Sequence, residues 1–278
     1  MTIREALRLA AARLEQAGVP DADVDAAYLL ASVLKEDTLA MRINGHRELA
    51  APQRAAFDAL CDRRAAREPL QYILGETEFM GLMFHVEPGV LIPRADTEIL
   101  VEKALEWMKP GARVLDIGTG SGAIAVSLAK LGRQAQVTAA DVSDRALEIA
   151  RQNAERNGAA VEFVKSDCFS ALKGRKYDMI VSNPPYISED EMRGLMPEVT
   201  REPELALFGG ADGLDFYRRI SREAPEYLNE GGCLLFEIGW LQKDAVSALV
   251  KAHIGEPFAL RDYGQNWRVV GARKEGAC

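Results

Sequence analysis

The amino-acid sequence predicts an α/β protein, with a small helical bundle at the N-terminus and a mostly parallel sheet over the rest of the chain. Residues 1–75 place apolar side chains at helical spacing and contain only three glycines. From residue 113 onward, short apolar runs alternate with helical stretches, which is typical of a parallel sheet covered on both faces. The last two runs, 258–262 and 267–272, have a short turn between them, which indicates an antiparallel hairpin.

Three helices account for the N-terminal region. A capping box, Thr2-x-x-Glu5, begins the first helix, and Pro52 suits the first turn of the third. The apolar residues expected to face the core of this bundle are Ile3, Leu7, Ala10 and Leu14, then Val24, Ala27, Tyr28, Ala31 and Leu34, then Phe57, Leu60 and Cys61.

A β-hairpin is expected to connect the bundle to the sheet. Residues 79–86 alternate loosely around Met80-Gly81, and a helix is expected from the N-cap Asp96 to Trp107. We therefore divide the chain into a helical docking domain (1–75), a hairpin linker (76–92) and a domain that carries the chemistry (93–278).

The sheet is expected to have seven strands, each bounded by turn residues or by a helix. Ser143 is placed to cap a helix that Gly158 terminates. The expected strands are 114–117, 137–140, 161–164, 177–181, 233–238, 258–262 and 267–272, and the expected helices are 123–130, 144–157, 215–228 and 241–252.

Composition excludes several classes of protein. The net charge of −8 argues against non-specific binding to nucleic acid, because such proteins are usually basic. The sequence has no apolar run of membrane-spanning length and no signal-peptide pattern, so we expect a cytoplasmic protein that does not bind membranes. Its four cysteines and three histidines are scattered, which predicts reduced thiols and no metal site.

A glycine-rich turn follows the strand at 114–117. Glycine permits a positive φ and lets a ligand approach the backbone. Asp141, 23 residues after Gly118, ends the next strand, where a carboxylate can accept hydrogen bonds from ribose hydroxyls. The residues of this candidate cofactor site are Asp116, Gly118, Thr119, Gly120, Ser121, Gly122 and Asp141.

Two cofactors compete for this turn. Its spacing satisfies the permissive fingerprint of nicotinamide dinucleotides, and a plain tight turn is a third interpretation. Asp116 stands where a carboxylate could meet the ammonium group of a methionine moiety. One residue, Ser121, separates the second glycine from the third, where the dinucleotide fingerprint has two. Both features favour S-adenosylmethionine.

The sequence Asn183-Pro184-Pro185-Tyr186 ends the fourth strand and is expected to face the same crevice as the glycine turn. The Asn183 side-chain carbonyl and the Pro184 backbone carbonyl can accept the two N–H bonds of a planar nitrogen, which favours positive charge growing on that nitrogen. The prolines fix the backbone, and Tyr186 offers a flat packing surface. The alternative is a rigid proline turn.

Together these motifs resemble the class I S-adenosylmethionine-dependent methyltransferases, whose fold is a seven-stranded Rossmann-like sheet. Within them, the chain is similar to the HemK/PrmC family, which methylates the Gly-Gly-Gln glutamine of peptide chain release factors. The resemblance covers essentially the whole chain. It rests on residues 69–75, 91–94, 96–98, 116–122, 183–186, 202–203, 213–215, 237 with 239, and 261–262.

The resemblance implies roles for single residues. Asn183 would touch cofactor and substrate, and Asn183, Pro184, Pro185 and Tyr186 would hold the glutamine and form the catalytic site. Relatives often carry an aromatic residue beside the adenine after the acid at 167, whereas this chain has Cys168 followed by Phe169. Two further residues, Arg94 and Glu98, would lie near the pocket mouth or form a salt-bridged helix start.

The resemblance also implies an enzyme that uses S-adenosylmethionine, yields S-adenosylhomocysteine and needs no metal. Its expected partner is a release factor, and we expect a monomer. Three alternatives stay open: a glutamine methyltransferase of a ribosomal protein, an adenine N6 methyltransferase of nucleic acid, and a cofactor-binding module without activity. Residues 1–75 hold 10 basic and 11 acidic residues, so the sequence offers no basic arm for nucleic acid.

Overall fold

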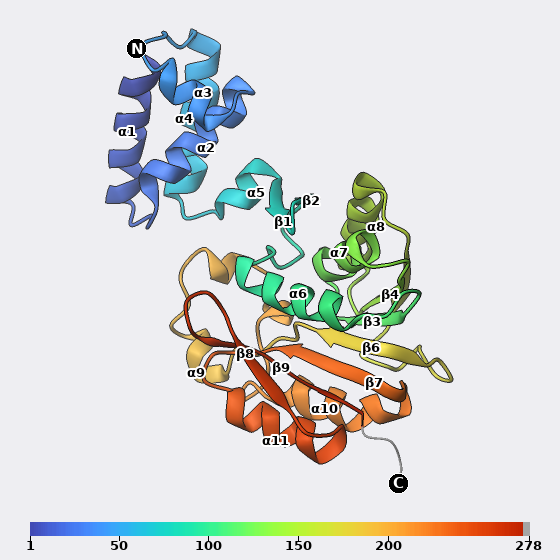
Figure 1. The fold of residues 1–278 in the computed structure, drawn as a ribbon. Helices are drawn as coiled ribbons and strands as arrows, with labels where there is room; N and C mark the ends of the chain where they lie inside the picture. The colour runs from blue at the N-terminus through green and yellow to red at the C-terminus, as the bar shows by residue number, and fades with distance from the viewer. Residues whose placement is uncertain (275–278) are drawn as a thin grey trace. The chain divides into compact units, whose positions relative to one another are not determined.

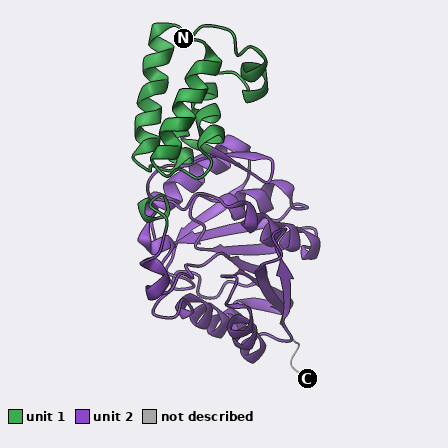
Figure 2. Cartoon of the chain, turned by 90° about the vertical axis from the view of Figure 1, so that its left-hand side faces the viewer, with its two compact units in different colours: residues 1–76, 196–201 green, residues 77–195, 202–278 purple. Residues whose placement is uncertain are grey.

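The computed structural model describes residues 1–274, and Cys278 lies outside the described residues. The chain forms two compact units (Figure 2). Unit 1 contains Met1–Glu76 together with Met196–Arg201, and unit 2 contains Thr77–Leu195 and the described residues from Glu202 onward. The predicted domain borders stay predictions, but they assign residues 196–201 to the third part of the chain, whereas the structure packs them in unit 1.

Unit 1 is a helical bundle. The predicted capping box is confirmed, since the Thr2 Oγ1 accepts from the Glu5 N–H at 3.3 Å and Glu5 accepts from the Thr2 N–H at 2.8 Å. Pro52 stands in the first turn of its helix as predicted. The helices are α1 (Ile3–Gln16), α2 (Ala22–Leu34), α3 (Thr38–Ile43), α4 (Ala51–Ala65) and α5 (Leu70–Leu74).

The predicted core face of α2 is correct for Ala27 and Ala31, which are buried, and wrong for two other residues. Val24 and Tyr28 are 41% and 50% exposed, and the helix instead buries Asp25 and Leu29. Asp25 is buried because its carboxylate accepts from the Arg64 Nε of α4 at 2.7 Å, and a polar residue on the core face is invisible to an apolar pattern.

The segment Met196–Arg201 is held in unit 1 by ion pairs. Glu198 accepts hydrogen bonds from Arg67 at 2.5 and 2.6 Å and pairs with Arg64 at 2.9 Å. Burial alone would raise the pKa of Glu198, but the hydrogen bonds from the two arginines outweigh it and lower the pKa to about 2. Unit 1 is therefore built from two stretches of chain that are far apart in sequence.

Unit 2 begins with the predicted hairpin. Strands β1 (Glu76–Phe79) and β2 (Leu82–His85) pair around Met80-Gly81, whose φ angles of 53° and 72° suit a tight hairpin turn. The hairpin connector of the predicted fold class is confirmed.

The large sheet of unit 2 has seven strands in the order β5-β4-β3-β6-β7-β9-β8 (Figure 1). Strand β9 runs antiparallel to both β7 and β8, and the other pairs are parallel. This confirms the predicted sheet with an antiparallel last hairpin. The strands are β3 (Arg113–Ile117), β4 (Gln136–Asp141), β5 (Val161–Lys165), β6 (Tyr177–Ser182), β7 (Leu228–Glu237), β8 (Phe258–Arg261) and β9 (Trp267–Arg273).

Helices cover both faces of this sheet, because successive strand residues point to opposite sides. In β3, Val114 packs in the core with α6 (Glu98–Trp107), α7 (Ala123–Leu131) and α8 (Asp144–Asn157), whereas Leu115 packs in the other core. The second core contains α10 (Asp215–Glu223) and α11 (Lys243–His253). The remaining short helices are α9 (Glu189–Met192) and the 3₁₀ turns η1 (Ala95–Thr97), η2 (Val199–Arg201), η3 (Glu204–Ala206) and η4 (Ala224–Glu226).

Two predicted helix boundaries are wrong. Asp96 does not cap a helix: it lies in η1, α6 begins at Glu98, and the Asp96 carboxylate pairs with Arg268 at 3.0 Å. The helix expected over 215–228 ends at Glu223, because Pro225 follows in η4. The Ser143 cap is confirmed, with its Oγ accepting from the Ala146 N–H at 3.2 Å.

Within residues 1–274, no helix is both long and apolar enough to cross a membrane.

Candidate functional site

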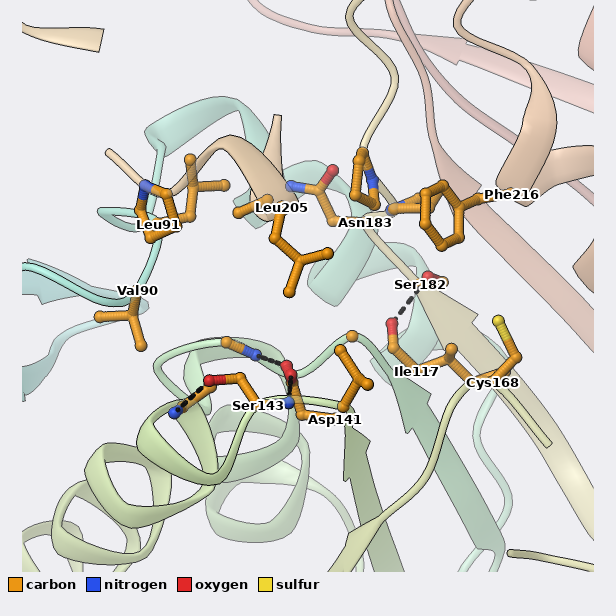
Figure 3. A pocket seen from close by; sticks show the side chains of 18 of the residues that line it. Val90, Leu91, Ile117, Asp141, Ser143, Cys168, Ser182, Asn183, Leu205 and Phe216 are labelled. Atoms are coloured by element: carbon orange, nitrogen blue, oxygen red, sulfur yellow. Dashed lines mark hydrogen bonds between the residues drawn. The ribbon is translucent and has the colours of Figure 1, made fainter. Parts of the chain in front are cut away.

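A cavity opens at the carboxyl ends of β3, β4 and β6, where open α/β sheets bind ligands (Figure 3). The space within it, including the part that is open to solvent, is about 860 Å³. Segments 89–91 and 166–168, together with Pro203, Leu205 and Ala206, form further parts of its wall. In Figure 3, Asp141 lies on one side of the cavity and Asn183 on the other.

The glycine turn forms part of the cavity wall. Gly118 and Gly120 have φ angles of 73° and 55°, and a Cβ added at either would meet no protein atom within 4 Å. Gly122 has another role, because an added Cβ would lie 3.0 Å from the Cβ of Ala150 in α8. The first two glycines therefore leave room for a ligand, and the third allows close packing of two helices.

Asp141 presents its carboxylate to the cavity. Its two oxygens accept from the Gly120 and Ser143 N–H groups, each at 2.9 Å (Figure 3). Burial raises the pKa of this carboxyl, while the backbone hydrogen bonds oppose that shift. Each carboxylate oxygen keeps a second lone pair, so the group is oriented and can still accept hydrogen bonds from a ligand.

Asp116 lies behind the turn and does not line the cavity. It is fully buried, and its Oδ2 accepts from the Thr119 Oγ1 at 2.6 Å. Its Oδ1 has no hydrogen-bond partner among the described residues, and burial raises the pKa of the carboxyl to about 7. Thr119, Ser121 and Gly122 also lie outside the wall, so the predicted contact of Asp116 with an ammonium group stays a prediction.

Asn183, Pro184 and Pro185 line the cavity. The Asn183 Nδ2 lies 3.4 Å from the Thr97 Oγ1, to which it donates. With its amino group directed to Thr97, the Asn183 side chain has its Oδ1 available as an acceptor.

Tyr186 does not line the cavity. Its backbone oxygen accepts from the Gln242 Nε2 at 2.9 Å, and burial raises the pKa of its hydroxyl. An added Cβ at Gly213 would collide with this same backbone oxygen, and one at Gly209 would lie 2.6 Å from the Pro185 oxygen. Two glycines thus let a loop support the segment 183–186 from outside the cavity.

The residues expected beside an adenine have separate environments. Cys168 lines the cavity, with a φ of 47°, and burial raises the pKa of its thiol to about 11. Phe169 does not line the cavity and instead stacks on Tyr227 with ring centroids 4.3 Å apart.

Arg94 and Glu98 also lie outside the wall. Arg94 pairs with Glu202, which accepts from the Ile92 N–H at 2.9 Å. Glu98 accepts from the Met80 N–H at 2.7 Å and so binds the hairpin turn. Arg94 thus forms a salt bridge, whereas the partner of Glu98 is a backbone N–H, and the two interpretations of these residues stay predictions.

Sequence reasoning missed the apolar part of the wall, to which Leu91, Leu205 and Phe216 contribute (Figure 3). A single leucine or phenylalanine carries no chemical signal. The flanking segments 202–203 and 213–215 had stood out only through the family resemblance.

Comparison with known proteins identifies the family. A model of the PrmC N-terminal domain matches residues 5–75, and a model of the methyltransferase small domain matches residues 89–201. The chain is 46% identical over 274 residues to the release factor glutamine methyltransferase of Geobacter sulfurreducens, covering 98% of this chain and 96% of that protein. The chain belongs to the release factor glutamine methyltransferase family. A second member, from Cereibacter sphaeroides, is 44% identical over 281 residues and covers 100% of both chains.

Solved structures agree on the fold. A methyltransferase from Pyrococcus furiosus aligns with a TM-score of 0.54 and 24% identity, over 71% of this chain and 91% of that one. A 16S rRNA N2 G1207 methyltransferase from T. thermophilus aligns with a TM-score of 0.53 and 20% identity, over 72% and 50%. Unit 2 of this family member therefore has the class I methyltransferase fold.

In the part of the chain that the structure describes, no group of three or more His, Cys, Asp or Glu side chains is arranged to hold a metal ion.

Proposed function

We propose that this protein transfers a methyl group from S-adenosylmethionine to the side-chain amide nitrogen (N5) of the glutamine in the Gly-Gly-Gln motif of peptide chain release factors. The observation that carries the proposal is the position of Asn183. It lies in the wall of a cavity that the glycine turn also lines, and its Oδ1 is available to accept an N–H bond.

The residues of the cavity fit S-adenosylmethionine. Gly118 and Gly120 leave space that a Cβ would fill, and the oriented Asp141 carboxylate can accept from ribose hydroxyls. Cys168 and the apolar wall can pack on a flat base. When bound, the cofactor supplies a methyl group on a sulfonium ion, which is electrophilic without help from a metal.

Asn183 and Pro184 orient the nucleophile. An amide nitrogen is a poor nucleophile because its lone pair is delocalised. If the Asn183 Oδ1 and the Pro184 carbonyl accept its two N–H bonds, the nitrogen is aimed at the methyl carbon, and the growing positive charge is stabilised. The new N–C bond forms as the C–S bond breaks, and one N–H proton leaves afterwards, so no strong base is needed.

We propose that unit 1 binds the release factor. A glutamine side chain offers little surface, so selection of the substrate needs contacts elsewhere, and the 10 basic and 11 acidic residues of 1–75 suit a protein partner better than a phosphate backbone. We expect no direct contact with nucleic acid, a monomer, and action in the cytoplasm, where release factors work.

The test is one incubation with cofactor labelled on its methyl group, offering purified release factor, ribosomal protein and duplex DNA side by side. We expect label on the release factor glutamine. Label on the ribosomal protein alone would keep the chemistry and change the partner, and label on DNA alone would refute the proposal. Asn183→Ala should lower turnover about 100- to 1,000-fold with folding intact, because it removes a positioned acceptor.

A further inference from the structure

Glu237 is a buried carboxyl group that the mechanism above does not use. It is the last residue of β7, it is 1% exposed, and its Oε2 has no hydrogen-bond partner among the described residues. An unsatisfied buried carboxyl is costly, so its presence needs an explanation.

The side chains around Glu237 belong to the site. Asn183 and Glu237 directly follow Ser182 and Phe236, which are partners in the parallel pairing of β6 with β7, so the two residues lie at neighbouring positions where these strands end. Thr97 and Asn183 act to lower the pKa of the Glu237 carboxyl, and the Tyr217 hydroxyl donates to the Glu237 backbone oxygen at 2.9 Å. Because the Thr97 Oγ1 accepts from the Asn183 Nδ2 at 3.4 Å, the Thr97 hydroxyl hydrogen stays available for another acceptor. The asparagine amide thus donates to the threonine, whose hydroxyl can in turn donate to a carboxylate.

The nearby charges do not neutralise Glu237 by a direct ion pair. Arg268 acts on it electrostatically, but the Arg268 guanidinium is paired with Asp96 and Asp262, each at 3.0 Å. The hydroxyls of Tyr186 and Tyr217 complete the titratable groups that face it.

We propose that Glu237 is a positioning residue, which together with Thr97 holds the amino end of the Asn183 amide and thereby turns its Oδ1 toward the nitrogen to be methylated. This inference rests on the proposed function and assigns a positioning role to a residue of the same site.

An asparagine side chain needs such a positioning residue because its Oδ1 and Nδ2 ends have similar shapes. Rotated by 180°, Asn183 would present its own N–H groups to the substrate N–H groups, and neither could accept. An ionised carboxylate only accepts, so it favours the productive orientation alone. Its negative charge behind the amide also favours positive charge on the substrate nitrogen.

Protonation of Glu237 should therefore slow the reaction. Burial raises its pKa to about 7 and the charge of Asp96 adds to this, while hydrogen bonds from Thr97 and Asn183 and the charge of Arg268 act in the opposite direction. The productive ionised form is populated above that value, so kcat should fall as pH drops through about 7.

The experiment measures kcat, KM for the release factor and cofactor affinity from pH 5.5 to 9 for the wild type and three variants. Glu237→Gln should lower kcat about 10- to 100-fold, as for the loss of a hydrogen bond to a charged group, and should abolish the acid limb with little change in KM. Thr97→Val should move the acid limb to higher pH, because a hydrogen bond that lowers the pKa is lost. The control is Glu230→Gln on the same strand, whose side chain is 68% exposed.

The outcomes separate two failures. If the wild type does not methylate the release factor, the proposed function fails. If it does, the positioning role is overturned by a wild-type kcat that is flat between pH 6 and 8, by Glu237→Gln with unchanged kcat and profile, or by a Thr97→Val acid limb that does not move. The wild-type and Thr97→Val profiles decide the matter even where Glu237→Gln does not fold.

Discussion

At the scale of single residues, the site contains two buried carboxyl groups that oppose stability at neutral pH. Asp116 and Glu237 each have one oxygen without a partner among the described residues, and burial raises the pKa of each to about 7. Their folded pKa values exceed the unfolded ones, so the folded state binds the extra protons between about pH 4 and 7. Their contribution to the free energy of unfolding is therefore largest in acid and is lost as pH rises to about 7.

Replacing Asp116 by asparagine should stabilise the protein above pH 7. Asp116→Asn removes a charge that is buried without a counter-charge, so we expect a gain that is about 2–3 kcal/mol larger at pH 8 than at pH 5. The check is thermal unfolding at both pH values. A gain of equal size at both would mean that ionisation is not the cause.

Replacing Asp141 should weaken the cofactor complex. Asp141→Ala removes an oriented acceptor from the cavity wall, and we expect a loss of about 1.5–3 kcal/mol in binding of S-adenosylmethionine by calorimetry. Asp144→Ala is the matched control, since that carboxylate is 78% exposed and pairs with Lys165. Tight binding of NADH without binding of S-adenosylmethionine would refute the cofactor assignment.

At the scale of elements, the segment 183–186 is held from behind by the loop 209–213. The Ile187 N–H donates to Leu207 and the Gly209 N–H to Ile187, each at 2.9 Å, and Gln242 binds both Tyr186 and Gly213. Gly209 and Gly213 of this loop lie too close to the supported backbone for any side chain. The backbone of segment 183–186 is thus held by residues outside the cavity.

Gly213→Ala should lower turnover at least about tenfold. The added Cβ would displace the Tyr186 carbonyl and with it the neighbouring prolines, and misplacement of a reacting group costs rate steeply. Gly174→Ala separates strain from crowding, because Gly174 has a similar φ of 81° but open space around it. Equal turnover in both variants would show that the loop does not position the segment.

Sequence patterns predicted the helices and strands better than the loops. The strands, the Thr2 and Ser143 caps and the hairpin turn were predictable because each depends on residues close together in the chain. The buried face of α2 was not, because Asp25 is compensated by Arg64 from another helix. Asp116 could be recognised as a candidate site residue, but its position could not be predicted. Whether a carboxylate lies in a cavity or behind the cavity wall depends on packing. The proline and glycine motifs that form the wall were identified, while Leu205 and Phe216 were not.

At the scale of the whole molecule, the chain passes from unit 1 to unit 2, returns for six residues and leaves again. The returning segment follows the catalytic loop and precedes Pro203 and Leu205 of the cavity wall. Its anchor is Glu198, whose low pKa means that its ion pairs stabilise the folded state above about pH 4.5 and are lost toward pH 2.

Glu198→Gln should therefore loosen residues 196–201. We expect faster tryptic cleavage after Arg201 at pH 7.5, because the segment loses its ion pairs with Arg64 and Arg67. Glu189→Gln is the control, since that glutamate is 65% exposed and pairs with the nearby Arg193. Equal cleavage rates would mean that the ion pairs do not hold the segment.

The same return of the chain determines when unit 1 can be completed during translation. The helices of unit 1 leave the ribosome first, but Glu198 follows Arg67 by 131 residues. At a translation rate of roughly 5–20 residues per second, Glu198 is added on the order of ten seconds after Arg67. During that interval Arg67 lacks its charged partner, whereas Arg64 can already pair with Asp25 of the same bundle. The final closure of unit 1 should therefore occur late in translation, after residues 183–186 have emerged.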